Sequence, residues 1–136
     1  MPRTKKINYT YQKGRRKSAS AKIRLYKGKD ENLVNGQPFE KYFPGDVNKS
    51  LWMLPFKTTD TLGKYYVSVK VRGGGLKGQL GAVTHGIAKA LVKEDPEKFK
   101  LSLRKAGLLT RDSRIRQRRM VGTGGKARGK KQSPKR

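Results

Sequence analysis

The sequence lacks cysteine altogether and contains a single histidine, His85. Without cysteine there is no disulfide scaffold, no thiolate zinc site and no cysteine nucleophile, and one histidine cannot build a two-histidine metal site. Long apolar runs are also missing, since no stretch approaches the ~20 residues that span a bilayer. No signal peptide is visible. We therefore expect a soluble, intracellular protein without a metal centre.

Acidic residues are scarce as well, with nine Asp plus Glu against 35 Lys plus Arg in 136 residues, which gives a formal net charge of +26. The excess is uneven. Residues 1–29 hold 11 basic residues and no acid, residues 30–97 hold nine basic and eight acidic residues, and residues 98–136 hold 15 basic residues and one acid. A nearly neutral middle between two cationic ends predicts a polyanionic partner that neutralises the ends on binding.

The C-terminal segment differs in composition from the rest of the chain. Residues 111–136 contain 11 basic residues and few apolar ones, so they cannot bury enough surface to offset the entropy of ordering. They also lack the apolar face of a membrane-surface helix. The sequence thus predicts a globular domain over residues 1–110, with its folded part from about residue 5, and an extended cationic tail over residues 111–136.

Alternating apolar residues predict the strands. Residues 18–26 read as a half-buried strand with Ala19, Ala21, Ile23 and Leu25 on one face, and residues 64–72 as another with Tyr65, Val67, Val69 and Val71 inside. Ile7, Tyr9 and Tyr11 suggest an earlier strand, joined to the next by a basic turn over residues 12–17. Asn35-Gly36 marks a further turn.

Helical spacing and capping residues predict three helices. Asp46 is expected to cap a short helix that Pro55 ends, with Val47, Leu51 and Leu54 on its buried face. Leu76, Leu80, Val83, Ile87 and Leu91 recur at helical spacing. The last helix has Asp95 as N-cap, Pro96 at its first position, Phe99, Leu103 and Ala106 on one face, and Gly107 as its end. The class is α+β, a two-layer domain with helices on one face of a sheet.

Gly73, Gly75 and Gly78 spell G-x-G-x-x-G between a predicted strand and a helix. A dinucleotide fold needs a second parallel strand that ends near an acidic residue, whereas Glu94 and Asp95 precede a helix, and the domain is too short. We therefore expect no cofactor. Two interpretations stay open: Gly74, Gly78 and Gly81 allow close helix-on-sheet packing, or the glycine-rich helix entry contacts an RNA sugar-phosphate backbone.

Two titratable residues stand out and neither suggests catalysis. His85 lacks a nucleophile and an orienting partner in the sequence, so a hydrogen-bonded structural or RNA-contacting role is favoured. Asp112 lies between Arg111 and Arg114 and reads as an ion-pair partner. We expect no catalytic residue and no enzyme.

Several motifs together resemble one family. They are GRRKSASAK (14–22), VNG (34–36), YF (42–43), VRGGGLKGQLGAVTHGIAKAL (71–91), LRKAGLLTRDSR (103–114) and the terminal KR (135–136). In this order they resemble the small-subunit ribosomal protein S-nine family in its bacterial or organellar form. The resemblance runs from about Tyr9 to the C-terminus.

The resemblance implies a fold and a function. The fold would be a small α+β domain like domain two of ribosomal protein S-five, with a left-handed βαβ crossover and a long extended basic C-terminal tail. The protein would be a structural constituent of the head of the small ribosomal subunit. Its partners would be small-subunit ribosomal RNA, neighbouring head proteins and the anticodon stem-loop of P-site tRNA, with no membrane and no small-molecule substrate. The expected location is the cytoplasm, an organelle matrix or stroma being the lesser expectation.

The resemblance also assigns residues to these contacts. The P-site tRNA contact falls on Lys135 and Arg136. The ribosomal RNA contacts fall on Arg15, Arg16, Lys17, Lys22, Arg24, Gly73, Gly74, Gly75, Lys77, Arg111, Arg114, Arg116, Arg118, Arg119, Lys126, Arg128, Lys130 and Lys131. The chain departs from the family at Pro134, where a serine is common, at Thr84, often an arginine, and at Gln117, often a glutamate. Pro134 has neither a hydroxyl nor a backbone donor, so no hydroxyl contact is expected there.

Two other functions remain to be distinguished. Residues 133–136 are similar to the Ser-Pro-basic-basic element of histone tails, which would suit a DNA-compacting protein. A nucleotide-dependent enzyme rests on G-x-G-x-x-G alone.

Overall fold

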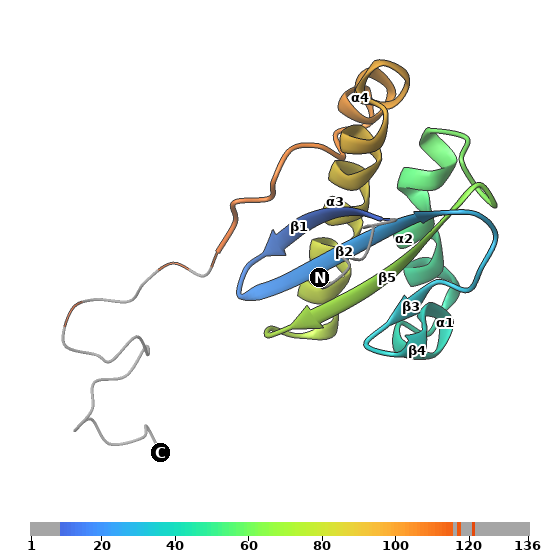
Figure 1. Cartoon of the computed structure of the whole chain (residues 1–136). Coiled ribbons are helices and arrows are strands. Elements are labelled where there is room, and N and C mark those ends of the chain that lie inside the picture. The colour runs from blue at the N-terminus through green and yellow to red at the C-terminus, as the bar shows by residue number, and fades with distance from the viewer. Residues whose placement is uncertain (1–8, 116, 118–120, 122–136) are drawn as a thin grey trace, which may run out of the picture.

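The structure is a computed structural model that describes residues 9–115, 117 and 121 (Figure 1). Ile7, Arg116, Arg118, Arg119, Lys126, Arg128, Lys130, Lys131, Pro134, Lys135 and Arg136, on which predictions above fall, lie outside the described residues. The strands are β1 (Thr10–Arg16), β2 (Ala19–Lys27), β3 (Leu33–Val34), β4 (Gln37–Pro38) and β5 (Tyr65–Arg72). The helices are α1 (Phe39–Tyr42), α2 (Asp46–Thr58), α3 (Leu76–Glu94) and α4 (Pro96–Lys105).

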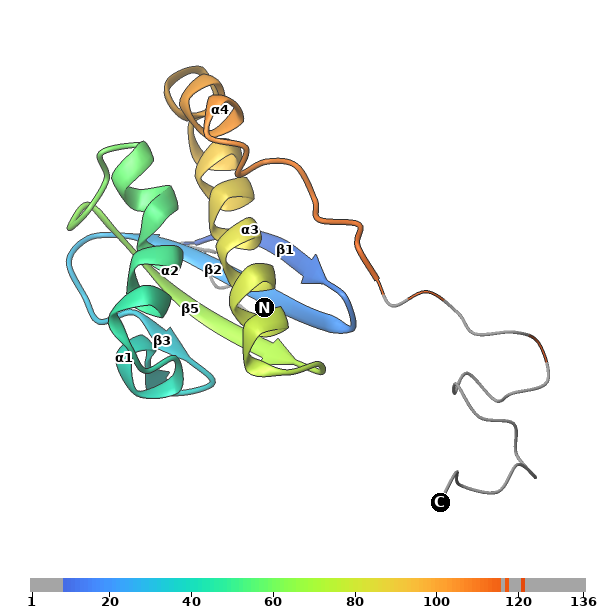
Figure 2. The ribbon, with the colours of Figure 1, turned by 180° about the vertical axis from the view of Figure 1, so that it is seen from behind.

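The strands form one mixed sheet in the order β1-β2-β5-β3-β4. β1, β2 and β5 are antiparallel neighbours, whereas β3 pairs with β5 in parallel and with β4 as a hairpin. The chain passes from β3 to β5 through α1 and α2, which makes a βαβ crossover. The long helices cover one face of the sheet (Figures 1 and 2). The predicted α+β class with helices on one face is confirmed.

The core lies between the sheet and α3. Ala19, Ala21, Ile23 and Leu25 of β2 are at most 2% exposed, and Val67, Val69 and Val71 of β5 are buried beside them. Each of these sets alternates with polar residues, so both predicted strand faces are confirmed. From α3 the core receives Leu80, Val83, Ile87 and Leu91, as predicted, while Leu76 in the first turn is exposed.

The prediction for β1 was wrong in its extent. The expected turn over residues 12–17 is mostly strand, and the chain reverses only at Lys17 and Ser18, between the paired residues Arg16 and Ala19. Lys17 has a φ of 53°, a left-handed conformation typical of tight turns. The strand reaches so far because it pairs with β2 along its whole length and packs its one glycine, Gly14, against α3.

The prediction for α2 was wrong in three respects. Its N-cap is Gly45, it continues through Pro55 to Thr58, and it buries Trp52, Pro55 and Phe56. The expected face is turned outward, since Val47, Leu51 and Leu54 are 75%, 45% and 40% exposed. Proline costs a helix about 3 kcal/mol, but here its ring is buried with the larger aromatic side chains. Tertiary burial decided the face and the extent of this helix.

The ends of α4 follow the capping prediction. The Asp95 carboxylate accepts a hydrogen bond from the backbone N–H of Lys98, and Pro96 opens the helix. Gly107 follows the last turn with a φ of 74°, and the N–H groups of Gly107 and Leu108 donate to the carbonyls of Arg104 and Leu103. This is a complete Schellman motif. Phe99 and Leu103 are buried as predicted, whereas Ala106 is exposed at the C-cap.

The Asn35-Gly36 turn is confirmed and joins β3 to β4. Both residues have positive φ, 51° and 81°, as in the type I′ turns of two-residue hairpins. The Asn35 side chain also bonds to both backbone groups of Val71, donating to the carbonyl at 3.1 Å and accepting from the N–H at 2.9 Å. It thereby ties the turn to the end of β5.

Over the described part of the chain, every helix is too short or too polar to cross a bilayer.

Candidate nucleic-acid interface

The interface is built where α3 lies unusually close to β1. A Cβ atom on Gly14 would stand 1.9 Å from the Ala82 carbonyl oxygen, and one on Gly86 would stand 2.5 Å from the Ile23 side chain. Real Cβ contacts are much longer, so only glycine fits at both positions. This contact fixes the β1–β2 hairpin against the N-terminal half of α3.

The glycines between β5 and α3 bring a third segment to the same place. Gly73 and Gly74 have left-handed φ angles of 79° and 65°, which favour glycine. A Cβ on Gly73 would lie 2.8 Å from the Ser18 carbonyl oxygen, and one on Gly74 would lie 3.1 Å from the Ala19 Cβ. The glycine-rich segment therefore packs against the hairpin turn. The packing interpretation is confirmed for Gly74 and, against the Arg16 side chain, for Gly81, whereas a Cβ on Gly78 would make only an ordinary contact at 3.8 Å.

The N-terminus of α3 opens at this site without a side-chain cap. Gly75 is its N-cap residue, its first turn contains no acidic side chain, and a Cβ on Gly75 would meet nothing within 4 Å. Free N–H groups at a helix start suit a phosphate oxygen. Lys77 in the same turn is exposed and adds a positive charge.

Arg16, the last residue of β1, crosses the surface of α3. Its Cδ would lie 2.3 Å from a Cβ on Gly81, so the absence of a side chain at Gly81 makes room for the arginine. The guanidinium reaches Asp112, with Nη2 and Oδ2 3.4 Å apart. Its buried Nε has no hydrogen-bond partner among the described residues. The packing thus lays the Arg16 side chain across the helix and leaves its Nε–H donor without a partner among the described residues.

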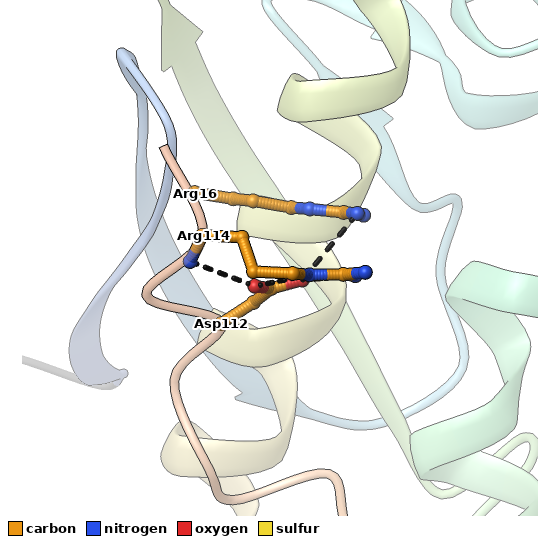
Figure 3. A network of polar contacts seen from close by, with 3 residues as sticks. All are labelled: Arg16, Asp112 and Arg114. Atoms are coloured by element: carbon orange, nitrogen blue, oxygen red, sulfur yellow. Dashed lines mark hydrogen bonds and ion pairs between the residues drawn. The ribbon is translucent and has the colours of Figure 1, made fainter. Parts of the chain in front are cut away.

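Asp112 joins Arg16 to Arg114 (Figure 3). The Arg114 side chain donates to the carboxylate from Nε at 2.9 Å and from Nη2 at 2.7 Å, and the Arg114 backbone N–H donates at 3.0 Å. These bonds, with the positive charge of Arg16, hold the pKa of Asp112 well below its ordinary value. The predicted pairing with Arg114 is confirmed. The pairing with Arg16 was not predicted, since nothing in either local sequence signals it.

Two adjoining clefts lie beside this network. One, of about 780 Å³, is lined by Arg16, Lys17, Ser18, Arg114 and Ile115. The other, of about 430 Å³, extends between the hairpin, α2 and α3, and its lining includes Arg15, Leu51, Lys77, Thr84 and His85. We call the two together the hairpin cleft. The structure therefore brings together Arg15, Arg16, Lys17, Lys77 and Arg114 from three distant parts of the sequence.

His85 forms part of the wall of the hairpin cleft. Its Nε2 lies 3.1 Å from the carbonyl oxygen of Leu109. Burial lowers its pKa, and the positive charges of Lys89 and Arg111 lower it further. The expected hydrogen-bonded structural role is confirmed. The contact holds the segment after α4 against α3, which directs Arg111 and Asp112 towards the hairpin.

Lys22 and Arg24, two of the sequence-predicted RNA contacts, are not part of this cleft. They alternate with the buried residues of β2 and so lie on the helix-free face of the sheet. Among the described residues no group of three or more His, Cys, Asp or Glu side chains could hold a metal ion. The chemistry that the cleft offers is guanidinium, ammonium and backbone N–H donors, which are suited to phosphate oxygens.

The sequence also matches a known protein family. The family model described as "Ribosomal protein S9/S16" matches residues 14–136, nearly the whole sequence. The chain belongs to the ribosomal protein S9/S16 family. Members of the S9/S16 family are structural, non-enzymatic constituents of the small ribosomal subunit that bind its RNA. Membership agrees with the resemblance read from the motifs, and it sets aside both the nucleotide-dependent enzyme and the DNA-compacting protein.

Proposed function

We propose that the hairpin cleft binds phosphates of small-subunit ribosomal RNA. The observation that carries the proposal is the convergence of Arg15, Arg16, Lys17, Lys77 and Arg114 around one cleft. Among the described residues only Asp112 contributes a carboxylate to its lining, and that carboxylate already pairs with two arginines. Counterion release from such a cluster favours a polyanion. Gly73, Gly74 and Gly75 contribute by exposing backbone near the helix start.

Asp112 has a positioning role in this proposal. It holds Arg114 by three side-chain hydrogen bonds and one backbone hydrogen bond, so it fixes the direction in which the chain leaves the domain. Residues 111–136 then act as a cationic tail that follows the RNA, and residues 1–110 as the globular domain. Arg111, Arg116, Arg118, Arg119, Lys126, Arg128, Lys130 and Lys131 would contact RNA phosphates along the tail.

The finer part of the proposal concerns the position of the protein in the ribosome. Lys135 and Arg136 would touch the anticodon stem-loop of P-site tRNA, and the domain would lie among head proteins in a cytoplasmic ribosome. The match of the family model through residue 136 supports a role for the tail. We also propose that the crossover from β3 to β5 is left-handed and that the domain has a fold like domain two of ribosomal protein S-five.

The test is sedimentation of a cell lysate on a sucrose gradient at physiological salt. We expect the full chain to co-migrate with small subunits, and a chain found only at the top of the gradient would refute the proposal. For the tail, deletion of residues 132–136 should leave assembly largely intact and weaken P-site tRNA binding. Unchanged tRNA affinity of the truncated subunits would refute the role of Lys135 and Arg136.

A further inference from the structure

The helix-free face of the sheet carries lysines in register across three strands. The strand pairing sets Lys13 of β1 opposite Lys22 of β2, and Lys22 opposite Lys70 of β5. Directly paired residues share a face, and all three side chains are exposed. In Figure 1 this face is turned to the viewer, with the long helices behind the sheet. The three ammonium groups therefore project from neighbouring strands on the same side.

Two arginines extend the row into a patch. Arg24 follows Lys22 by two positions along β2, and Arg72 follows Lys70 by two positions along β5, which is about 7 Å in each case. Both are exposed on the same face. We call these five residues the open-face cations: Lys13, Lys22, Arg24, Lys70 and Arg72.

The open-face cations lack anionic partners within the described part of the chain. None of the ion pairs found there includes any of the five. Like charges directly opposite each other on adjacent strands destabilise a sheet, and here two such pairs share Lys22. An arrangement that costs stability in the free protein points to a partner that supplies negative charge.

The tyrosines beside the patch indicate which part of a nucleic acid would meet it. The rings of Tyr26 and Tyr66 are stacked, with centroids 5.0 Å apart and an angle of 9° between their planes. The Tyr9 ring packs against Tyr26 at a tilt, with the two ring centroids 5.6 Å apart. The Arg24 guanidinium lies 5.0 Å from the Tyr9 ring centre. Base recognition uses aromatic rings that are free to stack, whereas these rings already contact one another. The patch is suited to phosphates and not to bases.

We propose that the open-face cations bind the sugar-phosphate backbone of a segment of small-subunit ribosomal RNA. Protein interfaces are depleted in lysine, so a lysine row favours RNA over an acidic protein as the occupant. The inference rests on the proposed function and extends it, because the hairpin cleft lies on the helix side of the sheet and the open-face cations lie on the other side. Arg15 belongs to both surfaces, since it lines the cleft and pairs with Ser20 on the face that carries Arg72. The domain would then be held between two segments of RNA.

The first test is lysine acetylation with an amine-reactive reagent, read by peptide mass spectrometry. The full chain is treated alone and in complex with small-subunit ribosomal RNA without other proteins. We expect the reactivity of Lys13, Lys22 and Lys70 to fall at least fivefold in the complex. Protection that appears only after the other small-subunit proteins are added would identify a protein occupant and overturn the proposal.

The second test compares two triple variants of equal charge. The first variant, Lys13→Gln/Lys22→Gln/Lys70→Gln, removes the lysine row. The control variant, Lys57→Gln/Lys100→Gln/Lys105→Gln, removes three exposed lysines, one in α2 and two in α4. The first should reduce the slope of log affinity against log salt by about 2 to 3, with the far-UV circular dichroism unchanged, and the control should reduce it much less. Equal slopes for both variants would overturn the inference, and failure of the unsubstituted chain to bind the RNA would instead overturn the proposed function.

Discussion

The substitution Gly14→Ala tests the contact that fixes the hairpin against α3. The added Cβ would stand 1.9 Å from the Ala82 carbonyl oxygen and 2.7 Å from the Gly86 backbone nitrogen. Ordinary contact begins near 3.4 Å, so strand and helix would have to separate by about 1.5 Å. Both obstacles are backbone atoms, which cannot rotate away.

Two effects of opposite sign decide how much Gly14→Ala changes the free energy of unfolding. Overpacking of a closely packed interior costs about 1–3 kcal/mol, and the upper end applies because backbone meets backbone. Replacing a strand glycine by alanine recovers about 0.5–1 kcal/mol of chain entropy. We therefore expect Gly14→Ala to lower the free energy of unfolding by about 2 kcal/mol or more, which lowers Tm by about 8–16 °C in a domain of this size.

The assay is urea and thermal unfolding followed by far-UV circular dichroism. The matched control is Gly75→Ala, at a position with a φ of −94° and nothing within 4 Å of the new Cβ. It should stay within about 1 kcal/mol of the unsubstituted chain. A Gly14→Ala chain as stable as the control would refute the close approach of α3 to β1 on which the hairpin cleft depends.

Three further outcomes follow from the described contacts. Asp112→Ala removes the acceptor of the Arg114 backbone N–H and should speed amide hydrogen exchange at Arg114 without moving the urea midpoint, because its bonds to Arg114 are exposed; unchanged exchange would contradict the positioning role. Asn35→Ala removes two hydrogen bonds to Val71 and places alanine at a φ of 51°, so the free energy of unfolding should fall by about 2–3 kcal/mol. A fall of less than half that value in a urea titration would count against the role of Asn35 in holding the turn to β5. Because the pKa of His85 is lowered in the fold, its contribution to stability is complete above its ordinary pKa of 6.5 and declines as the pH falls from there through the folded pKa. The free energy of unfolding, measured across this pH range, should decline towards low pH in the unsubstituted chain and decline less in His85→Gln. Equal declines in both chains would exclude His85 as the source.

Local signals in the sequence predicted the parts of the fold that depend on neighbouring residues. The alternation from Ala19 to Leu25 located β2, and Asp95 with Gly107 located the ends of α4, because capping and burial patterns act within a few residues. α2 was harder. Val47 and Leu51 are spaced four apart, as are Trp52 and Phe56, so both sets form helical stripes, and only packing against the rest of the core selects the aromatic one.

The candidate site, like the fold, was only partly predictable from the sequence. The basic run at Arg15–Lys17 and the glycines after β5 are visible as motifs. The basic run lines the hairpin cleft, whereas Gly73 and Gly74 pack against the hairpin turn beside it. The contact between Arg16 and Asp112 joins opposite ends of the domain, and no local pattern announces it. The row formed by Lys13, Lys22 and Lys70 depends on strand register. The turn at Lys17 and Ser18 sets the register of β1 on β2, where the sequence predicted a longer turn over residues 12–17, and the register of β2 on β5 depends on tertiary packing.

The central claim is that the hairpin cleft binds small-subunit ribosomal RNA, and competition binding tests it most directly. The full chain and an Arg15→Gln/Arg16→Gln/Lys17→Gln variant are bound to labelled small-subunit ribosomal RNA at physiological salt, with unlabelled duplex DNA as competitor. We expect duplex DNA to compete poorly and the variant to bind at least tenfold more weakly than the Lys57→Gln/Lys100→Gln/Lys105→Gln control. Equal competition by duplex DNA, or a variant that binds as tightly as the control, would contradict the claim.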